Sequence, residues 1–375
     1  MKIMYCLAGT FNSGGMERIV TGKANWLAAN GYDVSIVTTE QDGRPDFFPL
    51  DPRIERIDLD ILYSRNESRN PLRKYIVRKR KMTRHKELLT RAVERENPDI
   101  VISTFGNEVG IVPGIEHRCK KVIEIHFSRW YRLQLDRRGI WRLIDKYLTR
   151  KDKQLAARYD RFVCLTQEDK KNWGGQANLA VIPNFIGARA ETPAALDNRS
   201  MIAVGRLSYQ KGYERMIEAW KLVHERHADW TLHIYGGGEL EEEMKNLIRE
   251  RGLDEAVLIH KPTSDIQQKY LESSALVLSS RYEGLPMVLL EAMACGLPML
   301  SYTCQCGPRD IIRPGYNGLL VDEGDVAGLA EAINRTIEEE DFRHEMGRNS
   351  YAEANEYLQE KVMPLWTNLF HELTH

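Results

Sequence analysis

Two glutamates in the second half of the chain, Glu283 and Glu291, are spaced so that both could serve one ligand. Gly284 lets the backbone turn sharply after an expected strand, and a proline two residues later fits the first turn of a helix. The backbone amides that would then point at one spot are those of Leu285, Met287 and Val288. Such amides at a helix N-terminus bind anions, and carboxylates accept hydrogen bonds from hydroxyl groups. The segment therefore predicts a site for a ribose or sugar beside a phosphate.

A second loop carries the cations that a departing phosphate needs. Arg206 and Lys211 lie five residues apart in a loop bounded by Gly205 and Gly212, directly after an expected strand. Arginine offers a bidentate fork and lysine a point charge, so the pair can converge on one diphosphate. An enzyme without a metal needs such cations to neutralise a leaving nucleoside diphosphate. A single loop cation is more often solvated, and it is the combination with the glutamate pair that indicates a site.

Two other glycine-rich loops fail the tests for known phosphate motifs. The first, 9–15, begins like a P-loop, but Gly15 and Met16 stand where lysine and a hydroxyl residue are required. The second, at 236–238, has Glu241 where a dinucleotide fingerprint needs a small residue, within an acidic helix start. NAD binding is therefore not indicated, and the second loop is interpreted as a tight turn between a strand and a helix.

Strands and helices are expected to alternate along the whole chain. Short runs rich in valine and isoleucine lack strict polar alternation, which is typical of parallel strands buried on both faces. The expected strands are 2–7, 33–39, 99–105, 121–127, 161–166, 179–182, 200–204, 230–235, 256–260, 275–279, 299–302 and 318–321. Helices are expected at 15–30, 212–227, 239–251, 286–294 and 326–339. This alternation predicts doubly wound α/β sheets.

Length and charge divide the chain into two main parts. With 375 residues, the chain is long enough for two or three domains. Residues 1–186 hold 34 Lys and Arg against 23 Asp and Glu, whereas the remainder holds 19 against 31. We expect a first domain at 1–186, a second at 187–355 and a C-terminal helix at 356–375 that packs back on one of them. Opposite net charges suggest different partners for the two domains and attraction across a cleft.

The composition excludes several classes of protein. Apolar residues make up 42% and charged residues 29%, as in ordinary globular proteins. Six cysteines are too sparse for a disulfide scaffold and are not at zinc spacing, so no metal site is expected. No segment is apolar over a spanning length, and the N-terminus lacks a signal-peptide cleavage site. We therefore expect a protein of a reducing, cytoplasmic compartment.

Five segments, in their order along the chain, resemble the motifs of glycosyltransferase family 4, the group 1 retaining glycosyltransferases. They are Gly14-Gly15-Met16-Glu17-Arg18, Ile182-Pro183-Asn184, the loop from Gly205 to Gly212, the E-x7-E block from Glu283 to Glu291, and 307–321. The resemblance spans most of the chain and is weakest in the middle of the first half. It implies the α/β fold called GT-B, in which two Rossmann-like doubly wound domains face a central cleft.

The resemblance also implies roles for the matched residues. Arg206 and Lys211 would hold the diphosphate and stabilise its charge on departure. Glu291 would bind the ribose hydroxyls and Glu283 the donor sugar. The amides beside sugar and phosphate would be those of Leu285, Met287 and Val288, which follow Gly284. The donor would bind mainly to the second domain, without a metal or other cofactor.

The first domain would add a few groups to this site. Gly14 and Gly15 match the family's glycine loop beside the donor's phosphate and sugar. His126, expected at the end of a strand, stands where relatives often have a histidine near an outer sugar hydroxyl, although a lone histidine is more often part of the core. Phe127, where relatives often have Asp, and Asp310, where Glu is common, depart from the family pattern.

The first half also contains two strongly basic stretches. Residues 65–91 hold 11 Lys and Arg against two Glu, and 118–153 hold 12 against four acidic residues. Such runs are usually solvated helix faces. Because both lie in the domain that would bind the acceptor, we expect contact with an anionic membrane surface and a lipid-linked acceptor. Only Tyr75 is aromatic between 65 and 91 and no module signature is present, so a nucleic-acid partner is not expected.

Together the residues and the resemblance favour an enzyme that moves a hexose or N-acetylhexosamine from a UDP-linked donor to a saccharide or lipid-linked acceptor. The product would belong to a polysaccharide, a lipopolysaccharide or a glycolipid. The nucleobase is expected near Lys261, where backbone contacts would recognise it. The alternatives are a sugar-nucleotide epimerase on the same fold and a non-catalytic nucleotide-sugar or membrane-binding module.

Overall fold

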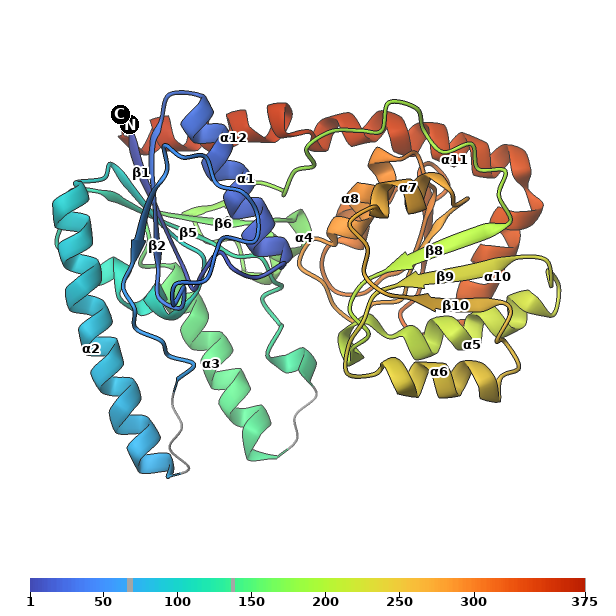
Figure 1. The fold of residues 1–375 in the computed structure, drawn as a ribbon, viewed down its shortest axis with the longest axis horizontal. Helices are drawn as coiled ribbons and strands as arrows, with labels where there is room; N and C mark the ends of the chain where they lie inside the picture. Colours follow the sequence, from blue (N-terminus) through green and yellow to red (C-terminus); the bar gives the residue numbers. More distant parts are fainter. Residues whose placement is uncertain (66–69, 136–138, 375) are drawn as a thin grey trace.

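The computed structural model describes residues 1–65, 70–135 and 139–374 and contains two lobes, each built on a parallel sheet (Figure 1). The first sheet has the order β3-β2-β1-β4-β5-β6-β7. Its strands are β1 (Lys2–Leu7), β2 (Asp33–Thr38), β3 (Glu55–Asp58), β4 (Ile100–Ser103), β5 (Lys120–Glu124), β6 (Arg161–Cys164) and β7 (Leu179–Val181). Every neighbouring pair is parallel, with Ile3 opposite both Val34 and Ile100. Burial of apolar strands on both faces explains their near-continuous hydrophobic sequence.

Helices cover both faces of this sheet. One face packs on α1 (Gly15–Ala29) and α12 (Gln359–Thr374), and the other on α2 (Pro71–Glu96) and α3 (Ile140–Ala156). The short helix α4 (Gln167–Asn172) follows β6, and Thr166 caps it by accepting a hydrogen bond from the Asp169 amide. Short 3-10 turns lie at Asn107–Gly110, Val112–Gly114 and Leu133–Leu135.

The second lobe repeats the pattern with the order β10-β9-β8-β11-β12-β13. Its strands are β8 (Ser200–Val204), β9 (Thr231–Tyr235), β10 (Val257–His260), β11 (Leu276–Leu278), β12 (Met299–Tyr302) and β13 (Gly318–Val321). The helices α5 (Tyr213–His224), α6 (Glu241–Glu250) and α10 (Val326–Glu338) cover one face, and α7 (Ile266–Leu271), α8 (Met287–Ala294) and α9 (Pro308–Ile311) the other. Two doubly wound parallel sheets are thus the fold that the alternation of elements predicts.

The strand order decides where a ligand can bind. In both sheets the order reverses direction beside the first strand, between β1 and β4 and between β8 and β11. Loops at the carboxyl ends of these strands diverge, and ligands of doubly wound sheets bind in the crevice between them. The loops that follow β8 and β11 are those with Arg206, Lys211 and Glu283. The topology therefore brings the two candidate loops of the sequence to one crevice.

The C-terminal segment joins the two lobes. From α11 (Glu340–Glu353) in the second lobe, the chain passes a 3-10 turn at Ala354–Tyr357 and enters α12, which ends close to the N-terminus (Figure 1). Val362, Trp366 and Phe370 of α12 are buried in the core of the first lobe. In the described part of the chain, no helix is both long and apolar enough to cross a membrane.

Several expected boundaries are wrong. The strand expected at 121–127 ends at Glu124, so His126 lies in the loop beyond it. The strand β3 and the long helices α2 and α3 had not been assigned. Charged residues dominate all three, and β3 is a short, exposed edge strand whose sequence has little apolar content. The C-terminal helix, expected at 356–375, begins only at Gln359, after the 3-10 turn at Ala354–Tyr357.

Candidate active site between the two lobes

Lys211 and Glu283 meet at the crevice of the second sheet. The Nζ atom of Lys211 donates to Oε1 of Glu283 at 2.6 Å, and the hydroxyl of Ser280 donates to the same oxygen at 2.6 Å. Both side chains are largely buried, with 17% and 8% of their surfaces exposed. A lysine and a carboxylate held this close at the edge of a cleft form an ion pair. The phosphate of an anionic ligand would compete with the carboxylate for the ammonium.

The loop with Lys211 is fastened to the loop with Glu283 by short contacts. Ser279 donates a hydrogen bond to the Lys211 carbonyl at 2.8 Å, and Gln210 donates one to the Tyr282 carbonyl at 2.9 Å. Gly212 has a φ of +61°, and a Cβ there would lie 2.6 Å from the Ser279 carbonyl oxygen. Because a side chain would collide with this carbonyl in a left-handed conformation, glycine is required to bring Lys211 against β11.

The first lobe touches this group directly. A Cβ at Gly284 would lie 2.6 Å from the main-chain oxygen of His126 and 3.0 Å from the Cα of Phe127. Glycine therefore permits the second lobe's E-x7-E segment to approach the loop after β5 within van der Waals distance. His126 and Glu283, which the sequence analysis assigned to one sugar site from different halves of the chain, are brought to the same seam.

The other glutamate, Glu291, lies in a different part of the cleft. Its Oε1 accepts a hydrogen bond from Nη1 of Arg18 at 2.6 Å, and its Oε2 accepts one from the hydroxyl of Tyr270 at 3.1 Å. Burial, and then the neighbouring Glu291 carboxylate, raise the pKa of Tyr270 well above its usual value, so the phenol keeps its proton and remains a donor. Glu283 and Glu291 thus each have a cation of their own, as separate binding groups would.

A pocket of about 210 Å³ opens between the lobes at Glu291. Its walls come from α1, from the segment joining the lobes, and from α7 and α8. They are Arg18, Ile186, Gly187, Ala188, Ile266, Gln267, Tyr270, Glu291, Ala294 and Cys295. Besides apolar groups, the pocket presents the carboxylate of Glu291, the phenol of Tyr270 and the polar side chains of Arg18 and Gln267. It suits a ring with vicinal hydroxyls, because the carboxylate can accept from both.

The remaining sequence-predicted residues lie around these two groups. Arg206 is exposed in the loop after β8, and Lys261 is exposed after β10, two strands away along the same edge of the sheet. Leu285 is buried, whereas Met287 and Val288 are half-buried in the first turn of α8. Met287 packs against the cores of both lobes. The structure therefore brings Lys211, Glu283 and Gly284 together and leaves Arg206 and Lys261 at the rim.

The glycine loop of the first lobe precedes α1. Gly14 is the N-cap of that helix and Gly15 its first residue, which is exposed with no atoms near the position of a Cβ. Glu17 is buried and accepts a hydrogen bond from Asn12 at 3.2 Å. Arg18, one turn into the helix, reaches the second lobe. The loop is thus held at the cleft, with Gly15 open to it.

The loop at 236–238 supports the cation loop and is a turn between β9 and α6, as interpreted from the sequence. A Cβ at Gly236 or at Gly238 would collide with the carbonyl of Gly205 or of Leu207. The amide of Leu207 donates to the Gly237 carbonyl at 3.0 Å. These glycines are required so that the loop before Lys211 can lie on the next strand's loop.

Asp310 makes a further contact between the two lobes. Its carboxylate accepts hydrogen bonds from the amides of Gln167 at 2.6 Å and Glu168 at 3.3 Å, at the start of α4 in the first lobe. A carboxylate at a helix N-terminus satisfies amides that have no partner within the helix. The residue that departs from the family pattern thus has a structural contact across the seam.

Sequence reasoning missed four residues of this region: Arg18 and Tyr270 as partners of Glu291, and Lys23 and Glu124 behind His126. A signal existed for two of them. Glu124 stands between Ile123 and Ile125 at the buried end of β5, and Lys23 lies on the buried face of α1. A charge at a core position is costly unless it is paired, so the two were candidates for each other.

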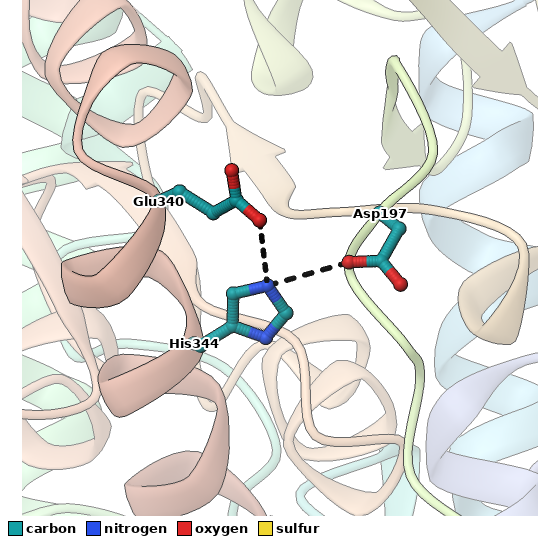
Figure 2. A group of neighbouring side chains, drawn as sticks. All are labelled: Asp197, Glu340 and His344. Atoms are coloured by element: carbon teal, nitrogen blue, oxygen red, sulfur yellow. Dashed lines mark ion pairs between the residues drawn. The ribbon is translucent and has the colours of Figure 1, made fainter.

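Three surface side chains elsewhere offer atoms of the kind that bind metals (Figure 2). Nε2 of His344 lies 3.4 Å from Oδ1 of Asp197 and 3.8 Å from Oε1 of Glu340. Both carboxylates are 70% exposed and therefore well hydrated. We interpret the group as surface ion pairs that connect the segment joining the lobes to α11.

Comparisons with known proteins show the family to which the two lobes belong. The family model described as Glycosyltransferase Family 4 matches residues 13–188, and that described as Glycosyl transferases group 1 matches 187–353. An uncharacterized glycosyltransferase of Haemophilus influenzae is 27% identical over 376 residues, covering 98% of this chain and 99% of its own. The amylovoran biosynthesis glycosyltransferase AmsD of Erwinia amylovora is 26% identical, covering 98% and 99%.

Two further comparisons concern a relative that matches a shorter part of the chain and a solved structure with a similar fold. A lipopolysaccharide 1,6-galactosyltransferase of Escherichia coli K12 is 28% identical over 261 residues, which is 68% of this chain and 70% of that protein. The solved structure of a sucrose-phosphate synthase from Thermosynechococcus elongatus superposes with a TM-score of 0.82 at 18% identity, covering 99% of this chain and 98% of that one. At this identity the second similarity concerns the fold alone.

Proposed function

Because the chain belongs to the group 1 glycosyltransferases of family 4 and has their GT-B fold, we propose that it transfers a hexose or N-acetylhexosamine from a UDP-linked donor, with retention of configuration. The acceptor would be a saccharide or a lipid-linked saccharide of polysaccharide, lipopolysaccharide or glycolipid synthesis. The relatives named for such pathways are transferases, which does not favour an epimerase or a silent binding module.

One observation carries the proposal: Lys211 and Glu283 form a buried pair at the crevice of the second sheet, against the His126 loop of the first lobe. In the donor complex, the ammonium of Lys211 would interact with the diphosphate as well as with Glu283. The guanidinium of Arg206, at the rim, would form bidentate hydrogen bonds with the same diphosphate. Preorganised cations at the point where negative charge develops are often the largest single contribution to catalysis. No metal is then needed to balance the leaving group.

The rest of the donor fits around this pair. The ribose hydroxyls would bind Glu291 in the pocket between the lobes, with Tyr270 holding the carboxylate from behind. The transferred sugar would lie between Glu283 and His126, beside Gly14, Gly15 and the amides that follow Gly284. The nucleobase would reach the rim of the sheet toward Lys261.

The proposed reaction breaks the bond between the anomeric carbon and the diphosphate oxygen and forms a bond from the same carbon to the acceptor oxygen, on the same face. The departing phosphate oxygen takes the acceptor's proton. Glu283 is a poor nucleophile in this arrangement because its Oε1 accepts from both Lys211 and Ser280. The carboxylate instead orients the sugar and keeps Lys211 in place.

The first lobe would bring the enzyme to its acceptor at an anionic membrane surface. Among described residues, 13 large apolar side chains are exposed, and eight of them lie on α2 and α3. They are Leu72, Tyr75, Ile76, Ile140, Trp141, Leu143, Ile144 and Tyr147. All belong to the first turns of these helices, whose beginnings project on one side of the lobe (Figure 1).

Basic side chains surround these apolar ones on the same turns. Arg73, Lys74 and Arg78 lie on α2, and Arg142, Lys146 and Arg150 on α3. Aromatic and basic residues together are typical of surfaces that enter the headgroup region, where each cation near an anionic leaflet contributes about 1 kcal/mol. We place the enzyme in the cytoplasm, at the inner face of the membrane, and expect no nucleic-acid partner.

The experiment that tests the reaction is an assay of nucleoside diphosphate release from UDP-, GDP- and ADP-sugars in the presence of membrane lipid extract. The product's anomeric configuration is then read by NMR. We expect release with a UDP-sugar and a product with the donor's configuration. Release with inversion would contradict the retaining mechanism, and release from a different nucleotide sugar alone would correct the donor.

A further inference from the structure

Three polar side chains run from the core of the first lobe to the seam between the lobes. Lys23 of α1 pairs with Oε2 of Glu124 at the end of β5, and both side chains are 1% exposed. The other carboxylate oxygen of Glu124, Oε1, lies 3.5 Å from Nε2 of His126. The chain of contacts thus ends at the residue whose main chain touches Gly284 of the second lobe.

Burying the charges of Lys23 and Glu124 in the core costs free energy of folding. Burial lowers the pKa of Lys23, whereas Glu124 has a pKa of about 2 despite its burial, chiefly because the charge of Lys23 stabilises its ionised form. The ammonium also lies 4.0 Å from the centre of the Trp366 ring and 5.5 Å from that of Tyr5. A buried ion pair is often no more stabilising than apolar residues of the same size. Its presence calls for another reason.

The ring of His126, whose two nitrogen atoms lack hydrogen-bond partners in the part of the chain that the structure describes, suggests a reason for burying this ion pair. Its side chain is 7% exposed, and within the described residues neither Nδ1 nor Nε2 makes a hydrogen bond. Oε1 of Glu124, the atom that faces Nε2, is likewise without a hydrogen bond in that part of the chain. Buried polar atoms nearly always have partners, so an imidazole left in this state at a cleft points to a partner that arrives with the substrate.

The geometry decides which ring nitrogen that partner would meet. A carboxylate accepts hydrogen bonds, so Glu124 favours the tautomer of His126 with its proton on Nε2. Nδ1 is then a lone-pair acceptor, suited to the hydroxyl of a sugar. Contacts of this kind are often long before substrate binds and shorten in the complex, as the 3.5 Å separation here allows.

We propose that Glu124 is a positioning residue that fixes the tautomer and orientation of His126, so that Nδ1 accepts a hydrogen bond from a hydroxyl of the transferred sugar. Lys23 keeps Glu124 ionised within the core, and Trp366 of α12 encloses Lys23. The inference rests on the proposed function, since the sugar contact of His126 belongs to it. It adds two residues, from α1 and β5, that do not touch the substrate.

The first test reads the tautomer itself, without substrate. Protein labelled with ¹⁵N-histidine is compared as wild type, Glu124→Gln and Glu94→Gln by two-dimensional NMR that distinguishes Nδ1 from Nε2. Glu94 is an exposed glutamate of α2 and serves as the matched control. We expect one tautomer protonated on Nε2 in the wild type and the control, and a mixture in Glu124→Gln. An unchanged His126 spectrum in Glu124→Gln would overturn the proposal.

The second test separates positioning from stability. Glu124→Gln leaves Lys23 buried without a counter-charge and can unfold for that reason alone, so Lys23→Met/Glu124→Gln is made as well. We expect the double variant to melt closer to the wild type and yet to keep kcat about ten- to a hundredfold low, with an unchanged KM for the donor, as for other residues that orient a functional histidine. Recovery of kcat in the double variant would show a structural role only.

The two failures can be told apart. If the enzyme transferred no sugar at all, the tautomer experiment would still test the link from Glu124 to His126. If transfer occurred and His126→Ala retained full kcat, the sugar contact would be wrong whatever the tautomer. Nucleoside diphosphate binding is measured in parallel, and we expect it to be the same in all these variants because the residues lie in the first lobe.

Discussion

Arg18 and Glu291 form an ion pair of 2.6 Å between residues 273 positions apart in the sequence, one in each lobe. Arg18 lies in the first turn of α1 beside the glycine loop, and Glu291 is the second carboxylate of the E-x7-E segment. The pair therefore joins two motifs that had been interpreted separately. Because Glu291 is also the proposed ribose ligand, the arriving donor must share this carboxylate with Arg18 or displace it.

Removal of Arg18 should release Glu291 for the donor. An ion pair with one partner 53% exposed contributes no more than about 1 kcal/mol. We expect Arg18→Ala to bind the nucleoside diphosphate up to about fivefold more tightly by isothermal titration calorimetry, because the ribose no longer competes with an arginine. Weaker binding by tenfold or more would mean that Arg18 is itself a ligand of the donor.

Removal of Lys211 should affect the chemical step. Lys211→Ala loses the cation that faces the departing diphosphate, and loss of one such electrostatic donor costs on the order of 3 kcal/mol in the barrier. We expect kcat to fall about a hundredfold or more in the assay of nucleoside diphosphate release. The matched control is Lys221→Ala, an exposed lysine of α5 in the same lobe, which should leave kcat unchanged.

This variant also uncovers the charge of Glu283, which is only 8% exposed. Its melting temperature must therefore be measured beside its activity. A folded Lys211→Ala protein with normal turnover would refute the diphosphate assignment. Lys211→Ala/Glu283→Gln removes both charges and should stay slow, because neutral partners restore the fold but supply no cation.

The beginnings of α2 and α3 should carry membrane binding. We expect the wild type to float with anionic liposomes and to stay behind with neutral ones. Trp141→Ala/Leu143→Ala should lose most of the binding, since each buried large side chain contributes about 1.5–3 kcal/mol. Leu222→Ala/Leu365→Ala, which removes exposed leucines elsewhere, is the control. Equal absence from both kinds of vesicle would refute a membrane role.

His85 should make the stability of the first lobe depend on pH. Its ring is buried in α2, the hydroxyl of Tyr63 lies 3.0 Å from its Nδ1, and burial lowers its pKa to about 4. The unfolded chain takes up this proton near pH 6.5 but the folded protein only near 4, so stability falls as pH falls between these values, by up to about 3 kcal/mol.

The measurement is urea unfolding at several pH values between 7 and 4. His85→Gln, which cannot titrate, should show a shallower decline over this range than the wild type, although it can be less stable at pH 7. Parallel curves for the two proteins would show that His85 takes up its proton equally in the folded and unfolded states.

Much of the fold could be predicted because parallel strands have a strong local signature. The runs at β1, β2 and β8 are apolar on both faces, and their boundaries were found to within one residue. The strand β3 has the sequence ERID and pairs only at the sheet edge, so nothing local marks it. The residues that α2 and α3 bury include polar ones such as His85, Asp145 and Thr149, so the apolar period that marks a helix is weak in their sequences.

The residues of the candidate site also fall into two groups, those that the sequence predicts and those whose contacts depend on how the lobes are arranged. Lys211 and Glu283 follow strands that flank the reversal of the sheet order, so the strand order of a doubly wound sheet brings them to one crevice, with Arg206 at its rim. The pairing of Arg18 with Glu291, and the approach of His126 to Gly284, depend on how one lobe sits against the other. That arrangement comes from contacts such as those of Asp310 and α12, which no local pattern encodes.

The proposed nucleotide-sugar site uses Glu291 for the ribose, and calorimetric titration of UDP, GDP and ADP into wild type and Glu291→Gln tests it. We predict that UDP binds and that, at a hundred times its Kd, it raises the free energy of unfolding by roughly 2.7 kcal/mol. We also predict at least tenfold weaker binding to Glu291→Gln, because a hydrogen bond to a charged group contributes about 1.5–3 kcal/mol. Binding of none of the three, or equal affinity in the variant, would refute a ribose site at Glu291.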